Sequence, residues 1–348
     1  MVIPGHGEAV SPESIFQRPV LMDSGLAVAR RPGMTRETLA GAKTKRNAAG
    51  SNRAQLSLAW PVDLGLTVAS HGWVHLEPWV WEPETGTLSH AERIGERLGT
   101  IAVRQRGPTA LLVSWTGFPA RAQAEILRRA GRWVSADWSP DAAVAALMPS
   151  FPEEAALVAR GGGRLLRCST FYEDFIKTLL TVNTSWSGTC RMVTALVAEP
   201  GGGAFPLPEM LIEYAEERLR QIAKLGFRAP TAVAATRRML DDGVLDAAGH
   251  GDTERLDHDY LLSLKGIGPY AAAHCRMLLH DFSRIPVDSV VVAHLRERHA
   301  TTPEAFIAAR AECGIYLGLG YRLMRLKEKF QVAQIELPPP SQRPESAY

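Results

Sequence analysis

Two glycines and an aspartate carry the clearest chemical signal in this sequence. Gly266 and Gly268 lie two residues apart in the segment Leu-Lys-Gly-Ile-Gly-Pro-Tyr. Asp288 follows Tyr270 by eighteen residues. Glycine adopts backbone conformations that other residues avoid, and it lets a second molecule approach the main chain closely. A tight turn that leads into a helix starting with Pro269 aims backbone N–H groups at an anion. The segment therefore predicts a helical hairpin, either a purely structural one or one that binds a phosphate.

Asp288 has two interpretations. It comes directly before an apolar run with helical spacing, where aspartate serves as the N-cap of a helix. The helix dipole would then orient the carboxylate and favour its ionised form. The same carboxylate could stabilise positive charge that develops on a substrate. The residues by themselves leave both the structural and the catalytic role open.

The elements around these residues are helical. From about residue 150 onward, apolar residues recur at helical spacing, as in residues 171–180, 190–198 and 290–299. Residues 256–264 and 271–280 flank the glycine turn and supply its two helices. The turn is therefore expected inside a mostly α region.

The preceding region has a different character, because seven of the eight tryptophans fall between residues 60 and 138. Short runs rich in β-branched and aromatic residues predict strands at 64–69, 73–81, 99–105 and 110–115, followed by a helix at 119–130. We expect a mostly α, two-lobed C-terminal core preceded by a smaller β-rich α/β domain. The predicted parts are a poorly ordered basic leader (1–53), a β-rich domain (54–150), a helical domain (151–333) and a disordered tail (334–348).

Composition limits the class of protein. The length of 348 residues suggests about two domains, and a net charge of +2 permits nucleic-acid binding without demanding it. No apolar run reaches the ~18–20 residues of a membrane span, and no secretory signal is visible. The four cysteines are far apart, which fits a reducing compartment and excludes a compact four-cysteine zinc or iron–sulfur site. We expect a cytoplasmic protein, nucleoid-associated if bacterial, with no membrane partner.

The hairpin and the aspartate resemble a known family. Leu-Lys-Gly-Ile-Gly-Pro-Tyr-Ala-Ala followed by Ile-Pro-Val-Asp is similar to the helix-hairpin-helix/Gly-Pro-Asp (HhH-GPD) motif of base-excision DNA glycosylases. Residues 171–186 and 225–230 resemble further segments of that superfamily. A β-rich domain before the helices is typical of its 3-methyladenine DNA glycosylase II and 8-oxoguanine DNA glycosylase branches. The resemblance implies the HhH-GPD fold for about residues 165–330.

The resemblance also implies DNA contacts. Gly266 and Gly268 match the glycines whose amides hold a DNA phosphate, and Lys265 adds a positive charge beside the duplex. The carbonyls of Lys265, Ile267 and Gly268 are candidate ligands for a bridging Na⁺ or K⁺. Asn183 matches the position that fills the gap left by a flipped base. Lys265 and Asn183 would otherwise be ordinary solvated turn residues.

The remaining implied roles concern the sugar and the base. Asp288 matches the family aspartate that stabilises the sugar cation. Tyr270 and His274 are four residues apart, so they share a helix face that is expected to look into the base pocket. Trp186 is a candidate for stacking on a base. Trp186 and His274 could equally be interior residues of the core.

Two departures from the family pattern narrow the expected activity. Bifunctional members carry a lysine, which forms a Schiff base with the sugar, at the position of Tyr270, so the resemblance implies a monofunctional enzyme. Only Cys313 follows Asp288, so no iron–sulfur cluster is expected. We interpret His294 and His299 as exposed helix residues and predict no metal site formed by side chains.

The sequence thus predicts a monomeric DNA N-glycosylase of base excision repair. It would bind double-stranded DNA, flip a damaged, alkylated base and hydrolyse its N-glycosidic bond. One alternative is a non-catalytic helix-hairpin-helix protein that binds damaged DNA. The other is a glycosylase/lyase for oxidised bases.

Overall fold

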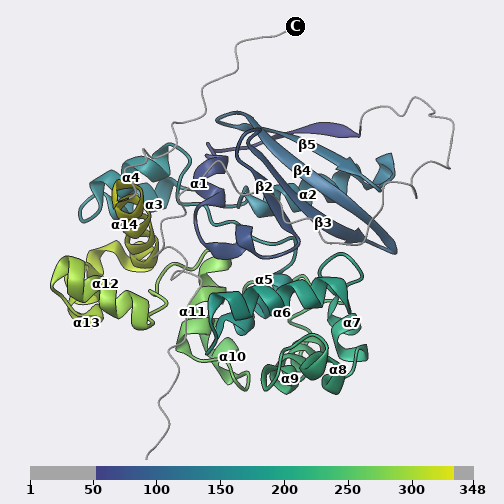
Figure 1. Ribbon diagram of the computed structural model, residues 1–348. Helices are drawn as coiled ribbons and strands as arrows, with labels where there is room; N and C mark the ends of the chain where they lie inside the picture. The colour runs from purple at the N-terminus through teal and green to yellow at the C-terminus, as the bar shows by residue number, and fades with distance from the viewer. Residues whose placement is uncertain (1–51, 333–348) are drawn as a thin grey trace, which may run out of the picture.

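A small antiparallel sheet and a larger set of helices make up the fold (Figure 1). The computed structural model describes residues 52–332. The predicted tail, 334–348, and nearly all of the predicted leader, 1–53, lie outside these residues, although Arg53 already begins the first strand. The predicted fold class, helices preceded by a smaller β-rich part, is confirmed.

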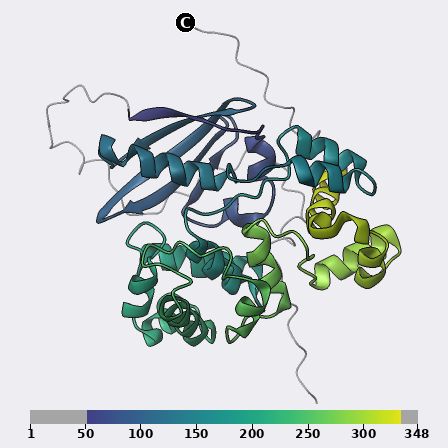
Figure 2. The same ribbon diagram turned by 180° about the vertical axis from the view of Figure 1, so that it is seen from behind.

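The sheet has five antiparallel strands in the order β1-β5-β4-β3-β2. Their bounds are β1 (Arg53–Ser57), β2 (Trp79–Glu82), β3 (Thr87–Ile94), β4 (Arg97–Gly107) and β5 (Ala110–Thr116). Alternate residues of β3, β4 and β5 are buried, so one face of the sheet is covered and the other is more open. Helix α2 (Gln123–Trp133) contacts β1, β4 and β5, and Figure 2 shows it lying across the sheet.

One of the predicted strands is wrong, and another is right only at its C-terminal end, where residues 79–81 belong to β2. Residues 64–69 form helix α1 (Leu64–Val68), because Asp63 accepts a hydrogen bond from the Leu66 amide and caps a helical turn. Most of 73–81 is a 3₁₀ turn, η2 (Gly72–His75), and its connection to β2. The strands predicted at 99–105 and 110–115 are confirmed as parts of β4 and β5.

Strands β1 and β3 were missed, and β3 shows why. Its inward-facing residues include His90 and Glu92, which are polar although they are fully buried. The strand therefore lacks the apolar alternation by which sequence reasoning recognises a half-buried strand. His90 and Glu92 instead join an ion-pair network with Glu173 and Arg129 that only the folded chain assembles.

The helices form two groups on either side of α11 (Figures 1 and 2). One group holds α5 (Phe171–Thr181), α6 (Trp186–Ala198), α7 (Pro208–Glu213), α8 (Glu216–Gln221), α9 (Arg228–Asp241) and α10 (His258–Ser263). The other holds α3 (Asp141–Leu147), α4 (Pro152–Ala159), α12 (Ser289–His299), α13 (Pro303–Ala308) and α14 (Leu317–Val332). Helix α11 (Pro269–Leu278) lies between them. The predicted domain boundary at residue 150 falls between α3 and α4. These two helices pack against each other, and α4 also contacts α14.

Helix α5 joins the sheet to the helices through buried charges. Every residue of α5 is buried. The Glu173 carboxylate lies 2.7 Å from the Lys177 ammonium and 3.1 Å from Nε2 of His90 on β3. Burial by itself would raise the pKa of Glu173, but Lys177 and His90 outweigh burial and lower it to about 2. Since a buried charge is tolerated only beside its partner, this network fixes how the sheet sits on α5.

Among the described residues, no helix is both long enough and apolar enough to cross a bilayer.

Candidate active site and nucleic-acid interface

The predicted helical hairpin is present between α10 and α11. Helix α10 ends at Ser263, and the Ile267 amide donates to the Leu264 carbonyl to close the turn at 3.1 Å. Gly268 is the N-cap of α11, and Pro269 occupies its first position. Ile267 is buried and anchors the turn to the core, whereas Lys265 and Gly266 are exposed. The sequence segment therefore forms the structure that its spacing predicted.

The two glycines of the hairpin serve different purposes. Gly266 has a φ of +86°, and a Cβ atom on it would lie 2.7 Å from Cγ2 of Thr231 on α9. Gly266 is thus required by the fold itself. Gly268 has an ordinary φ of −95°, and a Cβ atom there would meet nothing within 4 Å. The open space at Gly268 is where another molecule can approach the backbone.

The loop that carries Asn183 is held by the start of α9. Asn183 is exposed, has a φ of +51° and lies between α5 and α6. The Arg228 guanidinium donates to the carbonyl of Asn183 at 2.8 Å and to that of Val182 at 3.1 Å. Thr231, one turn along α9, touches the Gly266 position. The first turn of α9 therefore connects the Asn183 loop with the hairpin.

Phe227 is a surface residue that sequence reasoning did not single out. Its side chain is 62% exposed, and the Arg228 guanidinium covers one side of the ring at 4.3 Å. It immediately precedes α9, beside the Asn183 loop. A single exposed ring is common on protein surfaces, so the position of Phe227 beside the Asn183 loop, and not its exposure, makes it a candidate for DNA contact. The resemblance covered this segment, but nothing in its residue types shows that the ring is exposed.

Tyr270 and His274 are brought together as predicted, but with unexpected partners. Their rings stack at a centroid distance of 6.1 Å and an angle of 14°. His274 also lies 5.8 Å from His71 and 5.2 Å from Trp73, two residues from the sheet side of the molecule. Trp186 is half-buried at the start of α6 and packs against the hydrophobic core. We call Tyr270, His274, His71 and Trp73 the aromatic group.

Both imidazoles of the aromatic group are neutral. Burial, followed by the charge of Arg322, lowers the pKa of His274 to about 3. The same two causes lower the pKa of His71 well below its usual range. In residues 52–332, the ring nitrogens of both have no hydrogen-bond partner. His274 is thus an interior residue, which is one of the two roles that the sequence left open. Neither imidazole is protonated to the cationic form at neutral pH.

Asp288 is the N-cap of α12. Its Oδ1 accepts a hydrogen bond from the Val291 amide at 2.8 Å, and its backbone is extended. The preceding loop is fixed to α14, because the Gly318 amide donates to the Phe282 carbonyl. The structural interpretation of Asp288 is therefore confirmed. The same cap holds the carboxylate in one orientation at a helix N-terminus, which a catalytic role would also require.

This fold occurs in DNA glycosylases of known structure. The chain is similar to the 3-methyladenine DNA glycosylase from Archaeoglobus fulgidus, with a TM-score of 0.59, 16% identity, and coverage of 79% of this chain and 98% of that one. For the 8-oxoguanine glycosylase/lyase from Clostridium acetobutylicum in its apo-form, the TM-score is 0.60 and the identity 14%, with coverage of 80% of this chain and 96% of that one. For its complex with double-stranded DNA containing cytosine opposite 8-oxoG, the TM-score is 0.55 and the identity 15%, with coverage of 79% of this chain and 94% of that one. Scans of protein-family models and of curated proteins give no match.

At these identities the likeness defines the fold, which is that of the 3-methyladenine and 8-oxoguanine DNA glycosylases. The resemblance stated from the hairpin and Asp288 is confirmed at that level. The similar proteins include both a glycosylase and a glycosylase/lyase, so the fold alone does not choose between the two reactions.

Proposed function

We propose that this protein is a monofunctional DNA glycosylase that removes an alkylated base from double-stranded DNA. The observation that carries this proposal is the hairpin whose Gly268 faces open space, followed by Asp288 as the cap of the next long helix. The glycosylase fold around them supports the same assignment.

The proposed interface with DNA has two parts. At the hairpin, backbone amides near Gly268 and the exposed Lys265 would hold a phosphate. At the neighbouring loop, Asn183 would enter the space that a flipped nucleotide leaves, and Phe227 would stack on an adjacent base. The first turn of α9 contacts both the hairpin and the Asn183 loop. Phosphate binding at the hairpin and insertion of Asn183 would therefore be coupled.

In the proposed reaction the bond between C1′ of the sugar and the base nitrogen breaks. Its electron pair leaves with the base, and positive charge builds on the sugar. The Asp288 carboxylate, held by its bond to the Val291 amide, would stabilise this charge. Water then adds to C1′ and releases a proton. Tyr270 lacks the amine needed for a Schiff base with the sugar, so the product would be an intact strand with an abasic site.

The aromatic group supports an alkylated base as the substrate. Tyr270 is its half-exposed outer member, so an extruded base would stack there, above the buried His274. With a pKa of about 3, His274 is not protonated at pH 7, so it has no imidazolium proton to donate to a leaving base. A cationic alkylated purine leaves without such an acid, because it already carries the positive charge. A neutral base would need protonation that this group does not supply.

The experiment is excision from duplex oligonucleotides that contain alkylated adenine, hypoxanthine, uracil, 8-oxoguanine or mismatched adenine. Asp288→Asn keeps the helix cap, since asparagine caps about as well as aspartate. Asp257→Asn is the matched control, because Asp257 caps α10 in the same way through the Tyr260 amide. We expect alkali-dependent breaks at the alkylated base, at least about 100-fold slower with Asp288→Asn and unchanged with Asp257→Asn.

Three results would contradict this proposal. Tight binding to damaged DNA with no base release from any duplex would identify a non-catalytic binder. Borohydride trapping of a covalent DNA adduct by the wild-type protein would identify a glycosylase/lyase. Equal loss of excision in both asparagine variants would remove Asp288 from the reaction.

A further inference from the structure

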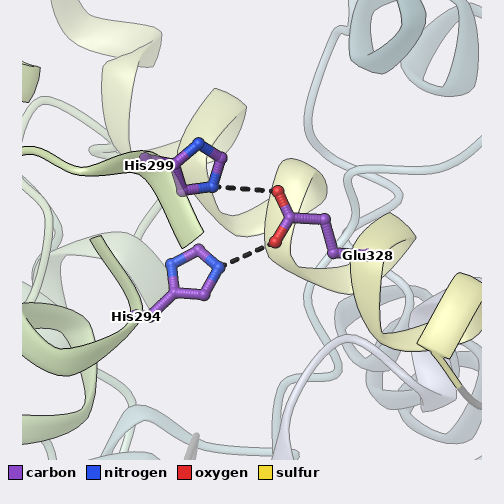
Figure 3. Close-up of side chains that lie close together, drawn as sticks. All are labelled: His294, His299 and Glu328. Carbon is purple, nitrogen blue, oxygen red and sulfur yellow. Dashed lines mark hydrogen bonds and ion pairs between the residues drawn. The ribbon is translucent and has the colours of Figure 1, made fainter. Parts of the chain in front are cut away.

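A second cluster of reactive side chains lies away from the proposed active site. His294, His299 and Glu328 point toward one another (Figure 3). Nε2 of His294 lies 2.8 Å from one oxygen of Glu328, and Nε2 of His299 lies 3.0 Å from the other. The two histidines were expected to be exposed helix residues. That expectation is wrong, because both are partly buried against α14.

The cluster joins two helices that are distant in the sequence. His294 and His299 lie in the second half of α12, and Glu328 lies in α14. The rings of the two histidines are 5.1 Å apart, and Phe306 packs against His299. The donor atoms are therefore held by packed elements rather than by a mobile loop.

The dimensions of the cluster suit one metal ion. The three donor atoms lie within 4.8 Å of one another. Around a tetrahedral Zn²⁺, with bonds of about 2.0–2.2 Å, neighbouring donors are about 3.4 Å apart. Small side-chain rotations that open the two histidine–carboxylate contacts and draw the imidazoles together would produce this spacing. Two histidines and one carboxylate also form a common zinc set that leaves a fourth position for water.

The surroundings of His294 favour a ligand role. Its Nδ1 lies 3.1 Å from the Tyr321 hydroxyl, which can fix the ring and its tautomer, as partners of metal-bound histidines do. The contact between His299 and Glu328 is close, yet it does not have the geometry of a hydrogen bond. Arg325 is the nearby charge that opposes a cation, so moderate affinity is expected.

We propose that His294, His299 and Glu328 bind a divalent transition metal ion, of which Zn²⁺ is the best match. The ion would fasten the C-terminal part of α12 to α14. Asp288 is at the other end of α12, about 16 Å along the helix axis from His299. The ion would therefore stabilise the element that carries Asp288 without contacting the reacting sugar.

The test uses the full chain without an affinity tag, stripped with a chelator and titrated with ZnCl₂ by calorimetry. Co²⁺ serves as a spectroscopic probe, because its visible absorption reports the ligands directly. The variants are His299→Gln and Glu328→Gln, and their melting curves with chelator show whether each is folded. His250→Gln is the control, because His250 also pairs with a carboxylate, that of Asp246, but among residues 52–332 it belongs to no cluster of three possible metal ligands.

We expect one Zn²⁺ per chain with micromolar or tighter affinity in the wild type and in His250→Gln. At a hundredfold excess over the dissociation constant, Zn²⁺ should raise the Tm by about 5 °C. Both site variants should lose at least about 100-fold in affinity together with the Tm shift. Absence of stoichiometric binding to the wild type would overturn the proposal, and so would binding that persists in a folded Glu328→Gln variant. These readouts need no DNA, so they are independent of the proposed glycosylase activity.

Discussion

The buried imidazole of His274 makes the stability of this protein sensitive to mild acid. In the folded chain, burial and then the Arg322 charge lower its pKa from 6.5 to about 3. In the unfolded chain the imidazole recovers its ordinary pKa and takes up a proton below about pH 6.5. The unfolded state therefore binds more protons between pH 6.5 and pH 3, and stability falls as the pH falls through this range.

The size of the effect follows from the two pKa values. Between pH 7 and pH 5 the unfolded imidazole gains most of one proton, while folded His274 stays neutral. This difference costs about 2 kcal/mol of the free energy of unfolding. His71 acts in the same direction because burial also lowers its pKa. His90 acts in the opposite direction: the charges of Glu173 and Glu92 outweigh burial and raise its pKa, so its contribution is present below pH 6.5 and is lost as the pH rises.

A comparison between variants isolates His274 from these other groups. Urea unfolding at pH 7, 6 and 5 should show the wild type losing about 2 kcal/mol more than His274→Leu over this range. Leu278→Val, a core truncation on the same helix, is the control. It should lower the free energy of unfolding by a similar amount at every pH. If His274→Leu keeps the pH dependence of the wild type, then His274 is not a neutral buried group and the reasoning fails.

Four further predictions concern the hairpin, the Asn183 loop and the buried ion pair of α5. Gly266→Ala should cost at least about 1–2 kcal/mol of unfolding free energy, because the φ of +86° is unfavourable for alanine. Gly268→Ala should change stability by less than about 0.5 kcal/mol yet weaken duplex binding in a fluorescence-anisotropy titration, and equal binding would place the DNA elsewhere. Lys177→Met should cost about 3–5 kcal/mol in urea unfolding, since it leaves the Glu173 carboxylate buried without its cation. Arg228→Ala should speed hydrogen exchange in the loop after α5 and weaken duplex binding, whereas unchanged exchange would show that the loop holds itself.

Local sequence determined the helical hairpin and the start of α12. Gly266 and Pro269 each impose a backbone preference within a few residues, and Asp288 supplies a cap to the amide three residues later. Such effects depend on bonds and sterics between near neighbours, so they are visible in a single sequence. The same is true of α5 and α11, whose apolar residues recur at helical spacing.

Other features were decided only by tertiary structure. Strand β3 was missed because His90 is buried inside an ion-pair network completed by Glu173, eighty-three residues away. His274 was found as a candidate, but its contacts with His71 and Trp73 join segments about two hundred residues apart. Periodicity reports which side of an element is apolar, and it does not report which distant side chain will meet it.

The histidine–glutamate cluster shows the same limit most clearly. His294 and His299 carry no ligand spacing that stands out in the sequence, and Glu328 lies on another helix. Their donor atoms converge only because α14 packs beside α12 and presents one carboxylate to both rings. The sequence by itself determined the hairpin, the capping role of Asp288 and the class of fold, because each depends on residue types and spacings that are close together in the chain. Tertiary packing decided which buried charges pair and which rings stack, because those contacts depend on how distant elements meet.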